Sequence, residues 1–204
     1  MSTTCGLATD SLSYCWGFRP NLGYPDDAGL SYAVPVPTPE GGHYRLLAAA
    51  SDKVCGLTND SLAFCWGRSP GDGTDRDSVP HLVGSNLRFR SLRGGGGVIC
   101  GLTADSTAYC WGLNEYGQVG NGIISPVQPT PSLVAGGALH FRTIAIGGLH
   151  ACGIASDHLT YCWGNNTFKQ LGVSDTLEPC GPGGQPDCAL TPQRLSDTIA
   201  FTTI

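Results

Sequence analysis

The stretch CGLTADSTAYCWG, residues 100–112, decides the fold because the chain contains four versions of it. The other three are CGLATDSLSYCWG at 5–17, CGLTNDSLAFCWG at 55–67 and CGIASDHLTYCWG at 152–164. Their tryptophans, Trp16, Trp66, Trp111 and Trp163, are separated by 50, 45 and 52 residues. A period of this length is typical of propeller blades, in which each repeat is a small antiparallel sheet. The sequence therefore predicts an array of four similar β-units.

Each copy is predicted to be a β-hairpin. In CGLTADSTAYC, apolar and polar residues alternate on both sides of residues 104–106, as in two antiparallel strands joined by a three-residue loop. Counting outward from this loop places Cys100 opposite Cys110. If the loop-closing pair is hydrogen-bonded, the cysteines form a non-hydrogen-bonded pair with Cα atoms about 4.5 to 5.5 Å apart, where a disulfide fits.

The ten cysteines form five local pairs by this count. The pairs are Cys5–Cys15, Cys55–Cys65, Cys100–Cys110, Cys152–Cys162 and Cys180–Cys188. Zinc is one alternative, although zinc sites usually contain a Cys-x₂₋₄-Cys turn, which this sequence lacks. Free buried thiols are another. The regular spacing favours disulfides, which indicate an oxidising compartment and would each contribute about 2 to 3 kcal/mol.

Composition supports a turn-rich, all-β protein. The 204 residues include 30 Gly and 14 Pro, only 13% are charged, and 41% hydrophobic residues suffice for a sizeable core. A net charge of −5 argues against nucleic acid or anionic lipid as a partner. No apolar run is long enough for a membrane span. The first ten residues lack the features of a signal peptide, so export would need a segment not present in this sequence.

A second phrase, an aromatic residue three positions before Leu or Ile, precedes three of the hairpins. It occurs at Tyr44–Leu47, Phe89–Leu92 and Phe141–Ile144, and once more at Phe201–Ile204. We therefore expect one repeat domain, 1–204. Its repeats would be approximately 1–43 plus a C-terminal strand 199–204, then 44–88, 89–140 and 141–198.

The combined motif resembles the regulator of chromosome condensation repeat family, in its secreted bacterial type with cysteine pairs. The phrase G-[LI]-[TA]-x-D-x-x-x-Y-C-W-G carries the resemblance, with LNEYGQVGNG after the third copy and FRTIAIGGLHACGI leading into the fourth. The resemblance covers nearly the whole chain in four repeats. It implies a β-propeller of four-stranded antiparallel blades, with a disulfide in each blade hairpin.

This chain departs from the family in two ways. The last loop position of the hairpin, where the family often has Gly, holds Ser11, Ser61, Ser106 and His158. Four repeats are also fewer than the family's usual seven. The chain is therefore expected to be a compact four-bladed ring, half of an eight-bladed ring of two copies, or part of a longer array. Strand 199–204 would pair with the first repeat, in the same molecule or a neighbouring one.

The resemblance implies a binding function without catalysis. The family's founder is a nuclear exchange factor that touches chromatin, a role that suits a disulfide-rich acidic chain poorly. Some bacterial relatives are secreted proteins that bind other proteins, including an inhibitor of β-lactamases. We therefore expect a secreted or cell-surface binding or assembly module, with a protein partner or a second copy of itself and no cofactor. The alternatives are a carbohydrate-binding, lectin-like propeller and a secreted inhibitor of an enzyme.

Candidate catalytic and metal sites are weak. His150, in GGLHAC, is interpreted as a structural hydrogen-bonding histidine, and its alternative role is that of a base. Residues 94–97, GGGG, resemble a phosphate loop only in composition and are expected to form a tight crossing between strands. Asp72, Asp75 and Asp77 could hold calcium, although this ion needs six or more oxygen ligands. The expected protein is therefore not an enzyme and has no assigned metal site.

The loops between repeats are the better candidates for recognition, because binding residues usually lie on loops carried by a rigid scaffold. The candidate partner-binding residues are Tyr24, Asp26, Asp27 and Tyr32 in the longest of these segments, with Tyr116 and Phe168 in comparable places of later repeats. The alternative is that these loops only cover blade edges.

Overall fold

The computed structural model describes residues 3–9, 11–18, 31–38, 42–74, 76–136, 139–173, 177–180, 187–195 and 199–204. These residues form four antiparallel sheets and, within these ranges, no helix. Blade 1 consists of β1 (Thr3–Leu7), β2 (Ser13–Phe18) and β3 (Ser31–Pro37). Blade 2 consists of β4 (Leu46–Ala49), β5 (Lys53–Leu57), β6 (Ala63–Arg68) and β7 (Arg76–Val83).

The other two sheets follow the same pattern. Blade 3 consists of β8 (Phe89–Gly95), β9 (Val98–Thr103), β10 (Ala108–Leu113) and β11 (Val127–Leu133). Blade 4 consists of β12 (Phe141–Ile146), β13 (His150–Ala155), β14 (Thr160–Asn165), β16 (Asp187–Arg194) and β15 (Glu178–Pro179). The predicted all-β propeller architecture is confirmed. Among the described residues, blade 1 has three strands and blade 4 has five, where four were expected in each.

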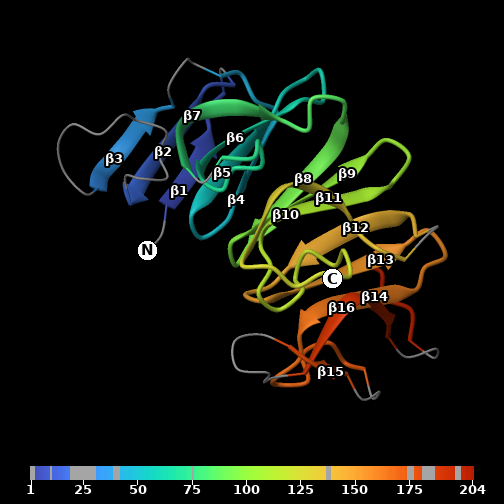
Figure 1. Cartoon of the computed structure of the whole chain (residues 1–204). Coiled ribbons are helices and arrows are strands. Elements are labelled where there is room, and N and C mark those ends of the chain that lie inside the picture. Colours follow the sequence, from blue (N-terminus) through green and yellow to red (C-terminus); the bar gives the residue numbers. More distant parts are fainter. Residues whose placement is uncertain are drawn as a thin grey trace.

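The blades follow one another along an arc, with blade 1 and blade 4 at its two ends (Figure 1). Contacts connect β1 to β4, β4 to β8 and β8 to β12, so these strands form the inner side of the array. The arc in Figure 1 is open, so the compact four-bladed ring is not the arrangement observed. Residues 199–204 form no strand here and lie against blade 4; their pairing with the first repeat stays a prediction.

The hairpin register is the predicted one. Leu102 lies opposite Ala108, and Cys100 lies opposite Cys110. The four hairpin cysteine pairs are disulfide-bonded with Cα–Cα distances of 4.0 to 4.1 Å, slightly below the expected range, and the Cys180–Cys188 pair is bonded with a Cα–Cα distance of 5.7 Å. All ten cysteines are therefore paired as the spacing predicted.

The last residue of each hairpin loop adopts the left-handed backbone for which the repeat family often uses glycine. The φ angles are 67° at Ser11, 65° at Ser61, 69° at Ser106 and 68° at His158. A residue with a Cβ atom is disfavoured there by about 1 kcal/mol. In each hairpin the disulfide links the two strands at the end opposite this loop.

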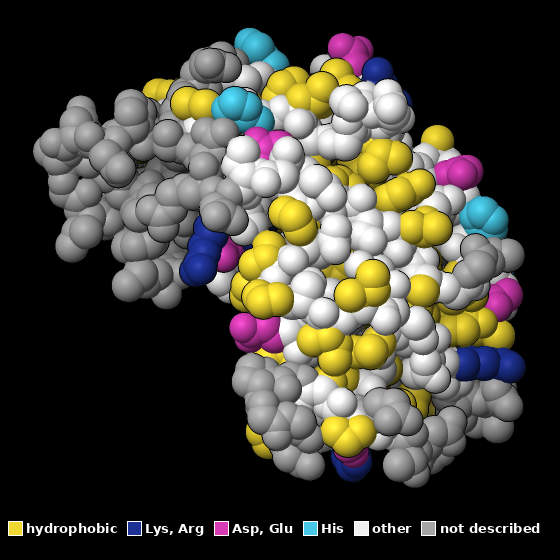
Figure 2. Space-filling model, in the orientation of Figure 1, with side chains coloured by type: hydrophobic (Ala, Val, Ile, Leu, Met, Phe, Trp, Pro, Cys, Tyr) yellow, Lys and Arg dark blue, Asp and Glu magenta, His cyan; other side chains and the backbone are white. Residues whose placement is uncertain are grey.

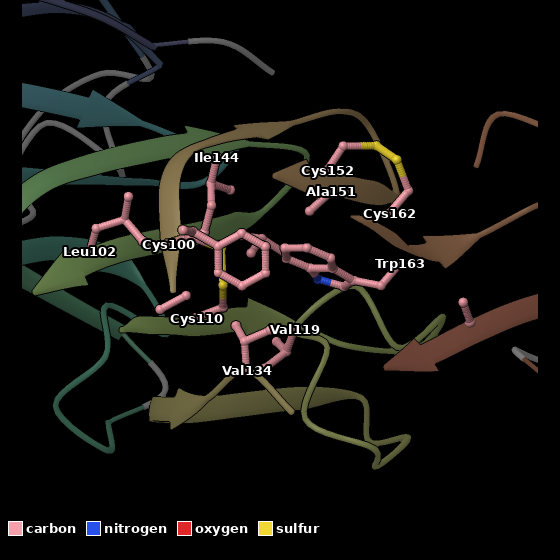
Figure 3. Close-up of a cluster of buried hydrophobic side chains, with 14 of the residues drawn as sticks. Cys100, Leu102, Cys110, Val119, Val134, Ile144, Ala151, Cys152, Cys162 and Trp163 are labelled. Atoms are coloured by element: carbon pink, nitrogen blue, oxygen red, sulfur yellow. A yellow bond between two sulfur atoms is a disulfide. The ribbon is translucent and has the colours of Figure 1, made fainter. Parts of the chain in front are cut away.

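The core consists of three clusters, one at each junction between successive blades. Trp66, Trp111 and Trp163 are fully buried in them. Trp111 Nε1 donates to the carbonyl of Pro70 at 2.7 Å, and Trp163 Nε1 donates to that of Gln118 at 3.0 Å. Figure 3 shows Trp163 pointing from blade 4 into the cluster. These tryptophans join neighbouring blades, as their recurrence in the sequence indicated.

The four glycines 94–97 lie where three blades approach one another. A Cβ atom on Gly94 would collide with the carbonyl oxygen of Ala49 in blade 2, and one on Gly96 would collide with that of Gly148 in blade 4. The segment is a close backbone crossing, as expected.

Candidate binding pocket at Tyr116 and Phe168

Two loops with the same internal structure form the candidate site. The loop after β10 reads NEYGQVG from Asn114, and the loop after β14 reads NTFKQLG from Asn166. The side-chain oxygen Oδ1 of the first Asn accepts a hydrogen bond from the backbone of Val119 in one loop, and Leu171 makes the same bond to Asn166 in the other, at 3.0 and 3.1 Å. Val119 and Leu171 are fully buried, which anchors each loop to its blade.

The aromatic residue of each loop is held by the same local hydrogen bond. Tyr116 N donates to Gln118 Oε1 at 2.8 Å, and Phe168 N donates to Gln170 Oε1 at 2.7 Å. Phe168 is 88% exposed, the largest exposure among the large hydrophobic residues of the described part. Each loop therefore buries its aliphatic residue, whereas its aromatic residue is exposed (Phe168) or partly exposed (Tyr116).

A pocket of about 440 Å³ lies between the two loops and the start of β13. Its lining includes Tyr116, Leu149, His150, Asn165, Phe168 and Gln170 and is mostly apolar. Two of the six predicted partner-binding residues, Tyr116 and Phe168, are thus brought together. Figure 2 shows hydrophobic side chains spread over the middle of the face it draws, with charged groups mainly around the rim.

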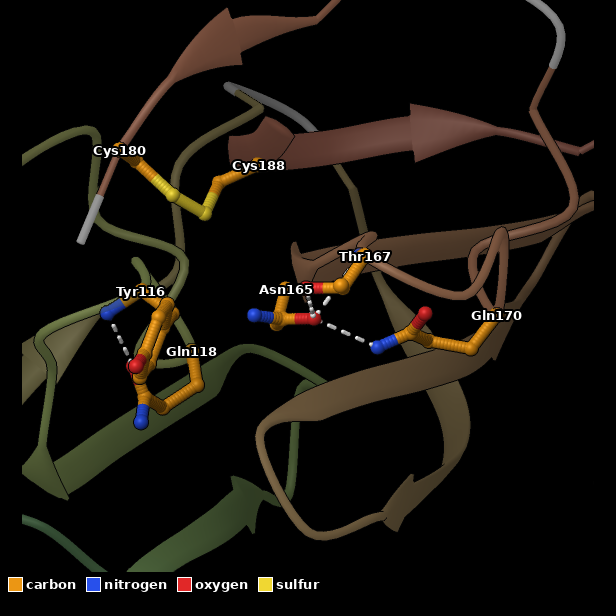
Figure 4. Close-up of a disulfide and its surroundings, with 7 residues drawn as sticks. All are labelled: Tyr116, Gln118, Asn165, Thr167, Gln170, Cys180 and Cys188. Atoms are coloured by element: carbon orange, nitrogen blue, oxygen red, sulfur yellow. Dashed lines mark hydrogen bonds between the residues drawn. A yellow bond between two sulfur atoms is a disulfide. The ribbon is translucent and has the colours of Figure 1, made fainter. Parts of the chain in front are cut away.

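Asn165 organises the polar side of the pocket. Its Oδ1 atom accepts hydrogen bonds from Thr167 N at 2.9 Å, Thr167 Oγ1 at 2.8 Å and Gln170 Nε2 at 2.7 Å (Figure 4). Since the amide oxygen is engaged three times, the side chain is fixed in one orientation.

His150 lines the same pocket with a half-buried imidazole. Burial lowers the pKa of His150 from its ordinary value of 6.5, because the charged form loses hydration. The ring rests on Gly147, where a Cβ atom would collide with it, and among the described residues no hydrogen bond of its ring nitrogens is found. The residue contributes a neutral ring near pH 7 rather than the hydrogen-bonded structural histidine that the sequence suggested.

The other candidate residues are not brought to this pocket. Tyr24, Asp26 and Asp27 lie outside the described residues; the backbone of Tyr32 lies opposite Gly17 in blade 1, and its side chain is not described. Sequence reasoning missed Asn165 and Gln170. The matching loop phrases NEYGQVG and NTFKQLG were the signal that could have found Gln170, whereas Asn165 precedes the second phrase and has Leu113 at the equivalent place of the first.

The calcium alternative at Asp72, Asp75 and Asp77 stays a prediction. Asp72 Oδ1 accepts hydrogen bonds from Thr74 N and Oγ1 at 2.9 and 2.7 Å, whereas Asp75 and the side chain of Asp77 lie outside the described part. Over the described ranges, no cluster of three or more His, Cys, Asp or Glu residues could hold a metal ion. In the same ranges, no helix has the length and hydropathy required to cross a membrane.

Comparison with known proteins identifies the repeats. Two sequence profiles, both described as the regulator of chromosome condensation (RCC1) repeat, match residues 105–154 and 141–170. Yeast RCC1 (Prp20) has the same fold: its structure from Saccharomyces cerevisiae aligns with a TM-score of 0.76 and 23% identity over 98% of this chain. Residues 105–170 of the chain therefore carry regulator of chromosome condensation repeats.

Two further proteins are similar to parts of this chain. The probable E3 ubiquitin-protein ligase HERC4 of Rattus norvegicus is 36% identical over 63 residues, which is 30% of this chain and 6% of the ligase. The ectodomain of the receptor kinase CR4 from Physcomitrella patens aligns with a TM-score of 0.53 and 28% identity over 86% of this chain and 43% of its own. This chain covers 51% of the Prp20p chain, about half of that propeller.

Proposed function

We propose that the protein is an extracytoplasmic, non-catalytic module that binds a partner protein through the Tyr116–Phe168 pocket. The observation that carries the proposal is Phe168, which is 88% exposed beside a largely apolar pocket. Aromatic side chains held by a rigid scaffold are typical anchors of protein interfaces, because they bury a large area at low cost in conformational entropy. The pocket suits an apolar side chain of the partner, with amides at its rim.

The extracytoplasmic setting is supported by the five disulfides, which persist in oxidising compartments. The structural similarity to the ectodomain of a receptor kinase also supports this setting. A secreted inhibitor of an enzyme would be one version of this function, with the target's surface loop as the ligand.

Partners of the yeast relative illustrate the class of ligand. One structure of yeast RCC1 (Prp20) contains Kap60, and Prp20p has binding properties toward Gsp1p and histones. Those partners are properties of the yeast protein, and only their chemical class is carried over to this chain. A protein ligand is the shared feature.

A lectin-like function would favour equivalent pockets in every blade. The loop of blade 2 reads RSPGDG from Arg68, without the aromatic and glutamine of the other two loops. The Tyr116–Phe168 pocket is therefore not repeated there, which favours a single protein-binding site over a ring of sugar sites.

A displayed peptide library, selected on the immobilised oxidised protein, tests this function. Selected peptides are expected to share an apolar residue and to bind Phe168→Ala at least about tenfold more weakly, because the anchor is lost. Leu133→Ala removes another exposed apolar side chain, 51% exposed on β11, and should bind as the wild type does. Equal binding by both variants, or selection of glycans but no peptide on an array, would contradict the proposal.

A further inference from the structure

Two neighbouring positions differ between blade 3 and blade 4, whose strands otherwise match. The first residue of the second strand is Val98 in blade 3 and His150 in blade 4, and each lies opposite the glycine that follows the blade's tryptophan. The residue after that glycine is Leu113 in blade 3 and Asn165 in blade 4. Blade 4 therefore has two polar residues where blade 3 has two apolar ones.

The other blades fill these positions with contacts inside the protein. Val98 belongs to a core cluster, and a Cβ atom on Gly97 would collide with the Leu113 side chain at 2.6 Å. In blade 2 the position of Val98 is held by Lys53, which donates to the Gly97 carbonyl and pairs with Asp52. The polar pair of blade 4 lines the Tyr116–Phe168 pocket instead.

Asn165 carries an unused hydrogen-bond donor in this pocket. Its side-chain atom beside Thr167 N is the oxygen, because a backbone N–H can only donate, so the other end of the amide is the Nδ2 amino group. Asn165 is only 4% exposed, yet no described residue accepts a hydrogen bond from Nδ2. Figure 4 shows Nδ2 on the side of the amide that faces Tyr116, away from Gln170. The donor is thus directed into the pocket.

An unpaired donor on a nearly buried side chain favours a ligand that brings an acceptor. Leaving such a group without a partner costs free energy, which a ligand oxygen would recover. The Tyr116 hydroxyl and the neutral imidazole of His150 each add an N–H or O–H group to the same lining. The free polar atoms of the pocket are therefore mainly donors, and the complementary ligand atom is a carbonyl or carboxylate oxygen.

The character of the lining favours a carbonyl over a carboxylate. The described lining residues include no Lys, Arg, Asp or Glu, and their surface is mostly apolar. A carboxylate placed there would lose hydration without gaining a cation, because His150 is neutral near pH 7. An amide carbonyl loses much less hydration, and the apolar walls accommodate the group attached to it.

We infer that the Tyr116–Phe168 pocket binds an uncharged main-chain carbonyl of the partner together with an adjoining apolar side chain, and that Asn165 Nδ2 is the donor that selects this carbonyl. This ligand class rests on the proposed function and adds the polar contact that the site requires. Phe168 and Leu149 contact the apolar side chain, and Asn165 determines specificity.

A titration with two small probes tests the ligand class on the wild type. N-acetyl-leucine methylamide carries uncharged carbonyls beside a leucine side chain, whereas 4-methylpentanoate carries a carboxylate on a similar apolar group. In the ¹⁵N-labelled oxidised protein at about pH 7.5, the amide probe should shift the side-chain NH₂ signals of Asn165. The carboxylate should bind at least about tenfold more weakly. Equal or tighter binding of the carboxylate, or no shift at Asn165 with the amide, would overturn the inference.

Two variants test the donor with the peptides selected on the wild type. Asn165→Asp retains an oxygen for Thr167 and Gln170 but replaces the donor, and Asn165→Leu installs the residue of blade 3 without adding a charge. Both should weaken peptide binding at least about tenfold. Asn59→Asp adds the same charge at the exposed hairpin tip of blade 2 and should bind as the wild type does. Unchanged binding by both Asn165 variants would contradict the role of Nδ2.

The sign of the pH dependence separates the two ligand classes through His150. Asn165 of β14, Gly147 of the preceding turn and Tyr116 of the blade 3 loop surround its ring, and Tyr116 is the other titratable group of the described lining. The charged neighbours in the two loops, Glu115 and Lys169, do not line the pocket. An uncharged ligand covers the imidazole further, so affinity should fall as the pH falls below about 6.5, whereas a carboxylate would bind more tightly.

His150→Gln should remove this pH dependence, and an affinity of the wild type that rises in acid would overturn the uncharged ligand class. The outcomes also separate this inference from the proposed function. If selected peptides require Phe168 but bind both Asn165 variants normally, the protein-binding function stands and the carbonyl contact fails. If no peptide is selected, the proposed function fails, and the two small probes still report whether the pocket selects a carbonyl.

Discussion

The ammonium nitrogen of Lys53 in blade 2 donates a 2.7 Å hydrogen bond to the carbonyl oxygen of Gly97 in blade 3. Lys53 is fully buried, and its Nζ atom lies 3.1 Å from Oδ1 of Asp52. Burial lowers the pKa of Lys53, and the Asp52 carboxylate opposes this shift. The lysine is therefore the second donor to a carbonyl at the blade junction, which also accepts a 3.1 Å hydrogen bond from Leu113 N.

Replacing this lysine should destabilise the fold. Lys53→Met leaves the Gly97 carbonyl and the Asp52 carboxylate without their cation, and we expect a loss of about 2 to 3 kcal/mol in the free energy of unfolding, measured with urea. Lys169→Met is the control, because its ion pair with Asp187 at 3.5 Å is exposed and is worth less than about 1 kcal/mol. Equal losses in both variants would contradict the structural role of Lys53.

The hairpin disulfides should each contribute measurably to stability. The double variant Cys100→Ala and Cys110→Ala opens a loop closed across 10 residues, and we expect a loss of about 2 to 3 kcal/mol in urea unfolding. Thiol titration of the unfolded, unreduced wild type should detect no free cysteine. Detection of ten thiols there would remove the disulfides and the argument for an oxidising compartment.

The left-handed loop positions predict opposite effects for two small changes. Ser61 has a φ angle of 65°, so Ser61→Gly should stabilise the protein by about 0.5 to 1 kcal/mol. Ser61→Val places a β-branched side chain in the same conformation and should destabilise it by about 1 kcal/mol or more. The two midpoints in urea should move in opposite directions; a shift of the same sign would show that the backbone conformation is not the cause.

Acid should destabilise the fold through His150. Because burial lowers the folded-state pKa of His150, the unfolded chain binds more protons below about pH 6.5, and stability falls as the pH falls through that range. Above this range both states are neutral and the residue has no effect. The urea midpoint should drop less between pH 7.5 and 5.5 in His150→Gln than in the wild type, since the other histidines are the same in both proteins.

Local pairing was predictable from the sequence, and the relation between blades was not. Cys100 opposite Cys110 follows from counting outward from a short loop, because strand residues alternate and the loop length is fixed. The bond from Lys53 to Gly97 joins residues far apart in the chain, and no periodic pattern marks it. The pocket at Tyr116 and Phe168 was predictable only in part. Both residues were found from their loops, but only the arrangement of the blades in the structure shows that they line one cavity.

Every disulfide closes a loop within one blade, and all ten cysteines are used in this way. A protease that cuts the exposed hairpin tip at Asp105 would therefore leave both fragments covalently linked through Cys100 and Cys110. After cleavage in a segment between blades, no disulfide links the two fragments. The cross-links thus protect the molecule against nicking at its most accessible turns, while leaving the connections between blades as the places where digestion can separate it.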